Sequence, residues 1–349
     1  MKLGISLLYS GSTYSVPVKK IQRAEELGYE SVWTAEAYGS DAITPLAYIA
    51  ALTKRIKLGT AIAQLAARTP ANLAMCAQTI DAMAGGDRML VGIGVSGPQI
   101  VEGWYGEPWG SPAGRLRDYV AICKKIWKRE GPVSHMGKEI SLPYKGPGAT
   151  GLGKPLKSIL HGNPRIPVLL GTISPGNIRL TAEIADGWFM SGAQTASVKH
   201  FIPVLQEGFA KRSDGMTLKD FRIQGSFNVI VTGDSAADVQ AALDSRKPEI
   251  ALYVGGMGAE KKNFHNENMI RNGFPEAAAR IQELFLAGRK DEAAAAVPDE
   301  FVELSGLFGP EARLKERWKR WADLPLYGLT LNTPSDEAME VMAKIAIGQ

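Results

Sequence analysis

Short apolar runs and amphipathic segments alternate along the chain, and this order predicts strands followed by helices. Runs such as residues 3–9 and 88–95 are typical of parallel strands that are buried on both faces. Between the runs, apolar residues recur at helical spacing, as in 71–84 and 114–128. The pattern predicts eight strands, at residues 3–9, 31–35, 56–62, 88–95, 166–170, 188–190, 221–231 and 327–331.

Eight strands alternating with helices predict an α/β protein with a (β/α)8 fold, the TIM barrel, which typically spans about 250 residues before insertions. The surplus of this 349-residue chain falls in a loop rich in Gly and Pro, residues 131–164, and in a mostly helical block. No linker-like run appears, so we expect one domain over residues 1–349, with the helical block at about 236–321 as an insertion. A doubly wound sheet is the alternative, although a linker or fewer strands would then be expected.

In a barrel of this kind, functional residues follow the carboxyl ends of the strands. That rule selects the stretches 34–41, 60–68, 96–105, 171–177 and 191–195. Gly92, Gly94 and Gly97 have the G-x-G-x-x-G spacing of a dinucleotide site, which requires a helix directly after the last glycine. The pattern predicts no helix before about Gly114, so a Rossmann site is disfavoured.

Acidic and aromatic residues gather beyond the second and fourth strands. Glu36 and Asp41 flank Tyr38 and could transfer protons, although helix capping and solvated loop acids are commoner roles. Glu102 is followed by Trp104 and a tyrosine, which could line a flat ring or simply pack within the loop.

The stretch 171–177 ends a strand and opens a helix at Ser174 and Pro175. Free backbone N–H groups and the helix dipole make such a start suitable for an anion or a phosphate. A plain capped helix, with Ser174 as the cap and Pro175 as the first helical residue, explains the same residues. Both interpretations stay open at this point.

Composition narrows the class of protein. The formal net charge is +4 with mixed signs along the chain, which argues against nucleic acid as a partner. No stretch approaches a membrane span or a signal-peptide core, so we expect a cytoplasmic protein with no membrane partner.

The four histidines lack metal-site spacing, and Cys76 and Cys123 fall on apolar helix faces. With no metal site and no nucleophile motif, the chemistry points to a bound organic cofactor.

Three segments together resemble the bacterial luciferase-like family, in its coenzyme F420-dependent oxidoreductase branch. They are IKLGTAIAQLAARTP, MLVGIGVSGPQIVEGWYG and LLGTISPGNIRLTAEIADGW. The resemblance spans nearly the whole chain. It implies an interrupted (β/α)8 barrel, usually a homodimer, in which a deazaflavin or flavin ring lies across the barrel mouth.

The resemblance also implies roles for single residues. A non-prolyl cis peptide is expected between Ala61 and Ile62, behind the cofactor ring. The other residues expected to bind the cofactor are Gln64 after that bond, Ser96, Gly97 and Gln99 at the ring and its side chain, Glu36 at the acidic position, and Ser174, Gly176 and Asn177 around the phosphate.

Two departures from the family pattern limit the activity that can be expected. Ala37 stands where many members carry a proton-donating histidine, and Gly97 stands where sugar-phosphate dehydrogenases carry an acid. The candidates for the proton donor are therefore Glu36, Tyr38 and Glu102. We expect hydride transfer between F420 and an unidentified small organic substrate. The alternatives are an FMN-dependent monooxygenase that uses reduced flavin and oxygen, and a cofactor-binding barrel without turnover.

Overall fold

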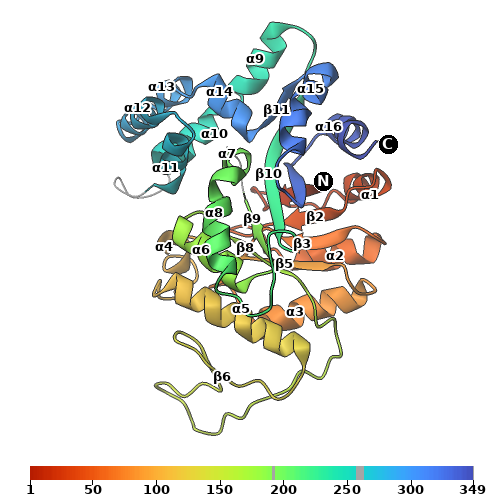
Figure 1. Ribbon diagram of the computed structural model, residues 1–349, viewed down its shortest axis with the longest axis vertical. Helices are drawn as coiled ribbons and strands as arrows, with labels where there is room; N and C mark the ends of the chain where they lie inside the picture. The colour runs from red at the N-terminus through yellow and green to blue at the C-terminus, as the bar shows by residue number, and fades with distance from the viewer. Residues whose placement is uncertain (191–192, 257–262, 349) are drawn as a thin grey trace. The chain divides into compact units, whose positions relative to one another are not determined.

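The computed structural model describes residues 1–190, 193–256 and 263–348, which form two compact units (Figure 1). The larger unit comprises residues 4–189 and 203–223. The smaller unit comprises residues 1–3, 190–202 and those from 224 onward.

Parallel strands form the centre of the larger unit. They pair in the order β1 (Lys2–Leu8), β2 (Ser31–Thr34), β3 (Lys57–Thr60), β5 (Met89–Gly94), β8 (Val168–Gly171) and β9 (Gly187–Phe189). A two-residue strand, β4 (Ala63–Gln64), follows β3 and also pairs with β5. All six residues of β5 are buried, as its unbroken apolar run predicts for a strand covered on both faces.

Helices connect these strands. They are α1 (Val18–Glu26), α2 (Thr44–Leu52), α3 (Pro70–Met83), α4 (Pro98–Val101), α5 (Pro112–Lys128), α6 (Pro175–Ile184) and α8 (Val198–Phe209), whose last residues belong to this unit. Three of them begin with a hydroxyl cap followed by proline, because Thr69 accepts from the backbone N–H of Asn72, Ser111 from that of Gly114 and Ser174 from that of Asn177. The chain leaves α1 through Gly28, whose φ of 82° is the left-handed conformation that the sequence predicts.

The smaller unit combines parallel strands with a set of helices. Within it, β10 (Arg222–Val231) pairs with β11 (Gly306–Gly309) and with β12 (Gly328–Asn332). Its helices are α7 (Ala193–Ala196), α9 (Ala236–Asp244), α10 (Lys247–Ala251), α11 (Phe264–Arg271), α12 (Pro275–Leu286), α13 (Lys290–Ala295), α14 (Asp299–Val302), α15 (Glu311–Ala322) and α16 (Asp336–Met342), with a π-helical turn at Leu252–Gly256 and another at Ala343–Ile347. Ile281, Phe301 and Phe308 lie in one buried apolar cluster that these elements share.

Each of the eight predicted strands is present, but the prediction of no helix before Gly114 is wrong. The short helix α4 begins directly after Gly97, whose carbonyl accepts from the N–H groups of Ile100 at 3.1 Å and Val101 at 3.0 Å. One turn is too short to show a helical period in the sequence, and proline at its first position has no N–H to leave unpaired.

Further strands lie where the sequence pattern shows none. β11 falls inside the predicted helical block, because two apolar residues between glycines are too few to reveal a strand. The predicted loop 131–164 contains a small antiparallel hairpin of β6 (His135–Met136) and β7 (Ser141–Leu142). The hairpin strands have two residues each, too few to show an alternating pattern, and β11 pairs with β10, which is distant in the sequence.

Candidate functional site

The register of the strands in the larger unit aligns the loops that the sequence singles out. Gln64 of β4 lies opposite Gly94 of β5, Gly94 opposite Gly171 of β8, and Gly171 opposite Phe189 of β9. The segments after these residues therefore follow one carboxyl edge of the sheet, which is where barrel enzymes place their sites. Of the predicted stretch 191–195, residues 191 and 192 lie outside the described residues.

The peptide bond between Ala61 and Ile62 is cis, as the resemblance implies. The backbone N–H of Ala61 donates to the carbonyl of Thr34 at 2.6 Å, which joins this segment to the end of β2. A Cβ at Gly94 or at Gly171 would come within 2.8 Å of the Ile62 side chain. Glycine at both positions therefore leaves room for Ile62 against β5 and β8.

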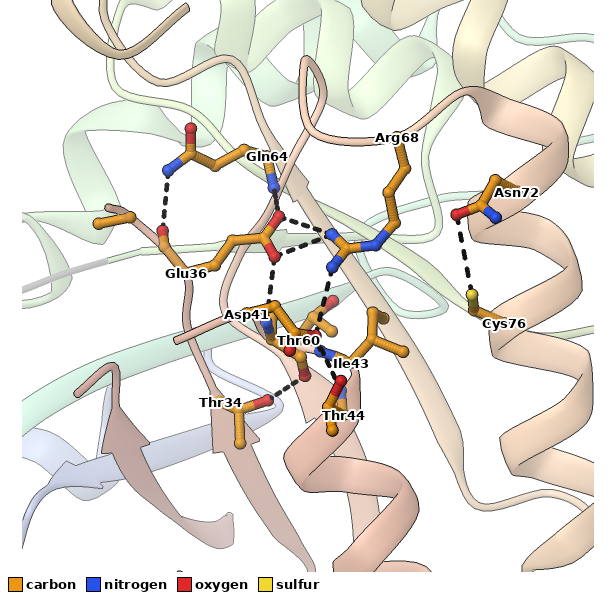
Figure 2. A network of polar contacts seen from close by, with 12 residues as sticks. Thr34, Glu36, Asp41, Ile43, Thr44, Thr60, Gln64, Arg68, Asn72 and Cys76 are labelled. Carbon is orange, nitrogen blue, oxygen red and sulfur yellow. Dashed lines mark hydrogen bonds and ion pairs between the residues drawn. The ribbon is translucent and has the colours of Figure 1, made fainter. Parts of the chain in front are cut away.

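Glu36 lies at the centre of a buried network of polar contacts (Figure 2). One carboxylate oxygen accepts from the backbone N–H of Gln64 at 2.7 Å, and the other accepts from that of Ala42 at 3.0 Å. The guanidinium of Arg68 donates to both oxygens, at 2.9 and 2.8 Å. Both carboxylate oxygens are thus engaged by donors, an arrangement that holds the ends of β2 and β4 together.

Arg68 is a site residue that the sequence reasoning missed. Its side chain is 17% exposed and also pairs with Asp41 at 3.2 Å. Burial alone would lower the pKa of Arg68, but the two carboxylates outweigh it and raise that pKa above its ordinary value. A signal was available, because Arg68 is the only basic residue in the loop after the predicted third strand, residues 63–70, and two acids follow the neighbouring strand.

Asp41 has the capping role that the sequence left open. One oxygen of its carboxylate accepts from the backbone N–H groups of Ile43 at 2.7 Å and Thr44 at 2.8 Å, at the start of α2. Burial would raise the pKa of Asp41, but these donors and Arg68 lower it below its usual value. Asp41 is therefore a capping and pairing residue.

Gln64 has one polar atom with no partner. Its side-chain N–H donates to the carbonyl of Glu36 at 2.9 Å, while its Oε1 is enclosed and accepts no hydrogen bond in the structure. Figure 2 shows this oxygen pointing away from Glu36. A buried acceptor without a donor is uncommon in proteins, and such atoms are often found where a ligand or a water binds.

The other predicted residues of the strand ends are more exposed. Tyr38 is 65% exposed, and Glu102 and Gln99 lie on the surface at α4. Ser96 has a φ of 58°, an unusual conformation for a residue with a side chain. In the described contacts, neither Tyr38 nor Glu102 is bonded to Glu36, so the structure does not gather the three predicted proton donors at one point.

The start of α6 shows the capping that one of the two interpretations predicts. Ser174 caps the helix by accepting from the N–H of Asn177 at 3.4 Å, and Pro175 is the first helical residue. Nothing lies within 4 Å of a Cβ built on Gly176, so its face is open. The capping is therefore confirmed, and the anion site stays a prediction.

The described residues contain no group of three His, Cys, Asp or Glu side chains that could hold a metal ion. Cys76 and Cys123 are free thiols. A search of the same residues for a helix of membrane-spanning length and hydropathy finds none.

Comparison with known proteins places the chain in a family. Residues 1–327 match the family model described as luciferase-like monooxygenase, and the chain belongs to that family. A protein of Mycobacterium tuberculosis named "Putative coenzyme F420-dependent oxidoreductase Rv3520c" is 40% identical over 347 residues, which are 99% of each chain.

Solved structures show the fold. The coenzyme F420-dependent tetrahydromethanopterin reductase from Methanopyrus kandleri superposes with a TM-score of 0.78 at 20% identity, over 99% of this chain and 98% of that one. An F420-dependent secondary alcohol dehydrogenase in complex with an F420–acetone adduct gives 0.71 at 15% identity, over 99% and 98%. The predicted (β/α)8 barrel and the predicted class, an oxidoreductase of the luciferase-like family, are confirmed.

Proposed function

We propose that this protein is an F420-dependent oxidoreductase that transfers a hydride between the deazaflavin ring and a small organic substrate. The relative that is 40% identical carries this description in its name, and two structural neighbours are named as F420-dependent. The observation on this chain that carries the proposal is the enclosed, unpaired Oε1 of Gln64 beside Ile62 at the strand edge.

The residues at this edge fit such a cofactor in two places. Leaving an enclosed acceptor unpaired costs about 1–3 kcal/mol, so Gln64 favours a ligand that brings an N–H group, which a deazaflavin ring has. The open backbone at Gly176 and the start of α6 suit its phosphate. When bound, F420 would supply the atom that gives or accepts the hydride. The residues that would hold it are Gln64, Ser96, Gly97 and Gln99 at the ring and its side chain, and Ser174, Gly176 and Asn177 at the phosphate.

In this proposal, Glu36 is a positioning residue and not the proton donor. Its oxygens already accept from two backbone N–H groups and from Arg68, so it keeps Gln64 and the 61–64 segment in place. Tyr38 and Glu102 are exposed and free of such contacts, which makes them the better candidates for carrying a proton to or from a substrate.

The phosphate assignment can be tested by titrating the purified protein with F420 and following fluorescence. We expect saturable binding by the wild-type protein and binding at least about tenfold weaker for Gly176→Asp, because a carboxylate there repels the phosphate. Gly131→Asp is the matched control, since Gly131 also has nothing within 4 Å of its Cβ position. Equal affinity of Gly176→Asp and wild type would contradict the phosphate assignment. Absence of saturable F420 binding by the wild type would contradict the function.

A second candidate is an FMN-dependent monooxygenase, which the description of the matched family favours. The two cofactors differ beside the carbon that reacts with oxygen, where a deazaflavin has carbon and a flavin has nitrogen. Oxygen consumption with reduced FMN would support the monooxygenase. A barrel that binds the cofactor without turnover is the third candidate, and it predicts F420 binding with no hydride exchange over a broad substrate panel.

A homodimer is the assembly that the resemblance implies, and we propose it for this chain. Analytical ultracentrifugation would show twice the 37.6 kDa mass of the chain. A monomer at micromolar concentration would contradict it.

A further inference from the structure

Exposed aromatic side chains gather on the loops at the carboxyl edge of the larger unit. Tyr9 and Tyr14 follow β1, Tyr38 follows β2, and Trp104 follows β5. They are 45%, 44%, 65% and 61% exposed, respectively. We call these four residues the aromatic rim. Large aromatic side chains exposed together commonly mark a surface that binds something.

Hydrogen bonds join the loops that carry the rim. The backbone N–H of Ser10 donates to Oγ of Ser40 at 2.9 Å, and the N–H of Ser40 donates to Oγ of Ser10 at 3.0 Å. The hydroxyl of Tyr105 donates to the carbonyl of Ala37 at 3.4 Å, which ties the loop of Trp104 to the loop of Tyr38. The rim therefore belongs to one connected surface.

The rim adjoins the Glu36 network. Asp41, which pairs with Arg68 in that network, lies in the same loop as Tyr38, and the Ala37 carbonyl that Tyr105 contacts is next to Glu36. Burial raises the pKa of the Tyr14 hydroxyl, and the negative charge of Asp41 raises it further. Tyr105 shows the same pattern, with burial first and then Glu36 raising its pKa. The rim thus continues directly into the residues proposed to hold the cofactor.

The charges of these loops are unbalanced. The loops of the rim and of the Glu36 network, residues 9–17, 35–43, 61–69 and 95–111, contain four acidic residues and one basic residue, Arg68, and the proposed phosphate position at 174–177 lies outside them. Arg68 is engaged by Glu36 and Asp41, whereas Glu102 and Glu107 are exposed and enter no ion pair in the described structure. Arg115 reaches the same loops from α5, where it donates to the neutral carbonyl of Pro108 and keeps its positive charge. With Arg115 included, the four carboxylates still outnumber the two cations, so an anionic group would meet a net negative charge here.

We propose that the aromatic rim binds the substrate, and that the substrate is a flat aromatic or polycyclic molecule without an anionic group, preferentially one that carries a positive charge. The aromatic faces stack on such a ring and attract a cation, and Glu102 adds to that attraction. The inference rests on the proposed function for the reaction and deepens it by naming the substrate class.

Three compounds that share the naphthalene ring system and differ in charge test the charge preference. Calorimetric titration with 2-naphthylmethylamine, 2-naphthalenemethanol and 2-naphthoate should give affinities in that descending order, with the carboxylate about tenfold or more weaker than the amine. Glu102→Gln should reduce the difference between the amine and the alcohol. Equal binding of carboxylate and amine, or no binding of any of the three, would overturn the proposal.

Variants of the rim test its location. Trp104→Ala and Tyr38→Ala should each weaken binding of the alcohol about fivefold through loss of ring contact. Tyr48→Ala on α2 is the matched control, since Tyr48 is 55% exposed and lies outside the rim. Equal affinities of Trp104→Ala and Tyr48→Ala would overturn the assignment. So would dissociation of an oligomer by Trp104→Ala alone, because the rim would then be a subunit interface.

F420 titrations of the same variants separate this inference from the proposed function. If the naphthalene series behaves as predicted and the wild type does not bind F420, the proposed function fails and the rim stands as an aromatic-binding surface. If F420 binds and the series shows no charge preference, the substrate class fails and the proposed function stands.

Discussion

Two buried arginine networks lie at opposite ends of the strands in the larger unit. At the amino end of β5, Arg88 donates to the carbonyls of Thr53 and Ile56, both at 3.0 Å, and to the Thr53 hydroxyl at 2.6 Å. Asp81 accepts there from the backbone N–H groups of Arg88 and Met89, at 2.9 and 2.8 Å. No side-chain atom of Arg88 or Asp81 is enclosed without a partner.

The network at the carboxyl end is also built around an arginine and an acid, but one of its buried polar atoms has no partner. Arg68 is half-buried and forms an ion pair with the buried Glu36, but Gln64 beside them keeps an enclosed oxygen without a donor. A complete network is expected where a barrel needs stability, and an incomplete one where it binds a ligand. The comparison therefore supports the proposal that the amino end serves stability and the carboxyl end binds the cofactor.

Arg88→Ala should give the largest effect and separate the two ends. Three acceptors around Thr53 and Ile56 would lose their donors, which we expect to reduce the free energy of unfolding by about 4 kcal/mol in urea. The F420 affinity of the folded protein should stay within about twofold of wild type. Arg55→Ala is the control, because the Arg55 side chain donates a hydrogen bond to the Glu25 carbonyl at the exposed surface, where water can replace it. Equal stability of the two variants would show that the amino-end network contributes little.

Arg68→Met should reduce both stability and binding. It leaves the Glu36 carboxylate buried without its cation, for which we expect a loss of about 3 kcal/mol in the free energy of unfolding. Because Glu36 also holds Gln64, the F420 affinity should fall as well, measured by the same titration as above. The double variant Glu36→Gln with Arg68→Met should recover more than half of the lost stability. A double variant as unstable as Arg68→Met alone would contradict the pairing.

Most of the fold was predictable from the sequence because the strands are apolar runs separated by amphipathic helices. Caps such as Ser174 and the left-handed Gly28 could also be located in advance, since each requires only local chemistry. The short elements α4 and β11 could not, because one turn or four residues show no period.

The candidate site was predictable only in part. The cis bond at Ala61 came from the family resemblance, and periodicity alone carries no sign of it. Arg68 was predictable in principle, because Glu36 follows one strand and Arg68 is the basic residue in the loop after the neighbouring strand. The unpaired Oε1 of Gln64 depends on how one side chain is oriented by the Glu36 carbonyl, which a residue pattern does not encode.

A third polar network extends the comparison to the hairpin of β6 and β7. Asp118 on α5 accepts from the backbone N–H groups of Glu139 at 2.7 Å and Ile140 at 2.9 Å, and contacts His135 at 3.0 Å. Both carboxylate oxygens of Asp118 therefore accept hydrogen bonds. We expect Asp118→Asn to lower the free energy of unfolding by about 1.5 kcal/mol and to leave F420 affinity unchanged. Glu130→Gln, an exposed acid just before the hairpin, is the control.

The pH dependence of this effect has a defined sign. Burial raises the pKa of Asp118, but the two N–H groups and His135 lower it to a net value below the usual range. The stabilisation is therefore complete above the unfolded pKa of about 3.9 and is lost as pH falls through the lower folded pKa. The difference in unfolding free energy between wild type and Asp118→Asn should shrink as the pH falls below about 4. A difference at pH 2.5 as large as that at pH 7 would contradict this account.

The most direct test of the central claim is a side-by-side fluorescence titration of the cofactor-free protein and its Gln64→Leu variant with F420 and with FMN. The account predicts saturable binding of F420 by the wild type, weaker binding of FMN, and a clear loss of F420 affinity when the Gln64 acceptor is removed. Tighter binding of FMN, or an F420 affinity unchanged by Gln64→Leu, would contradict it.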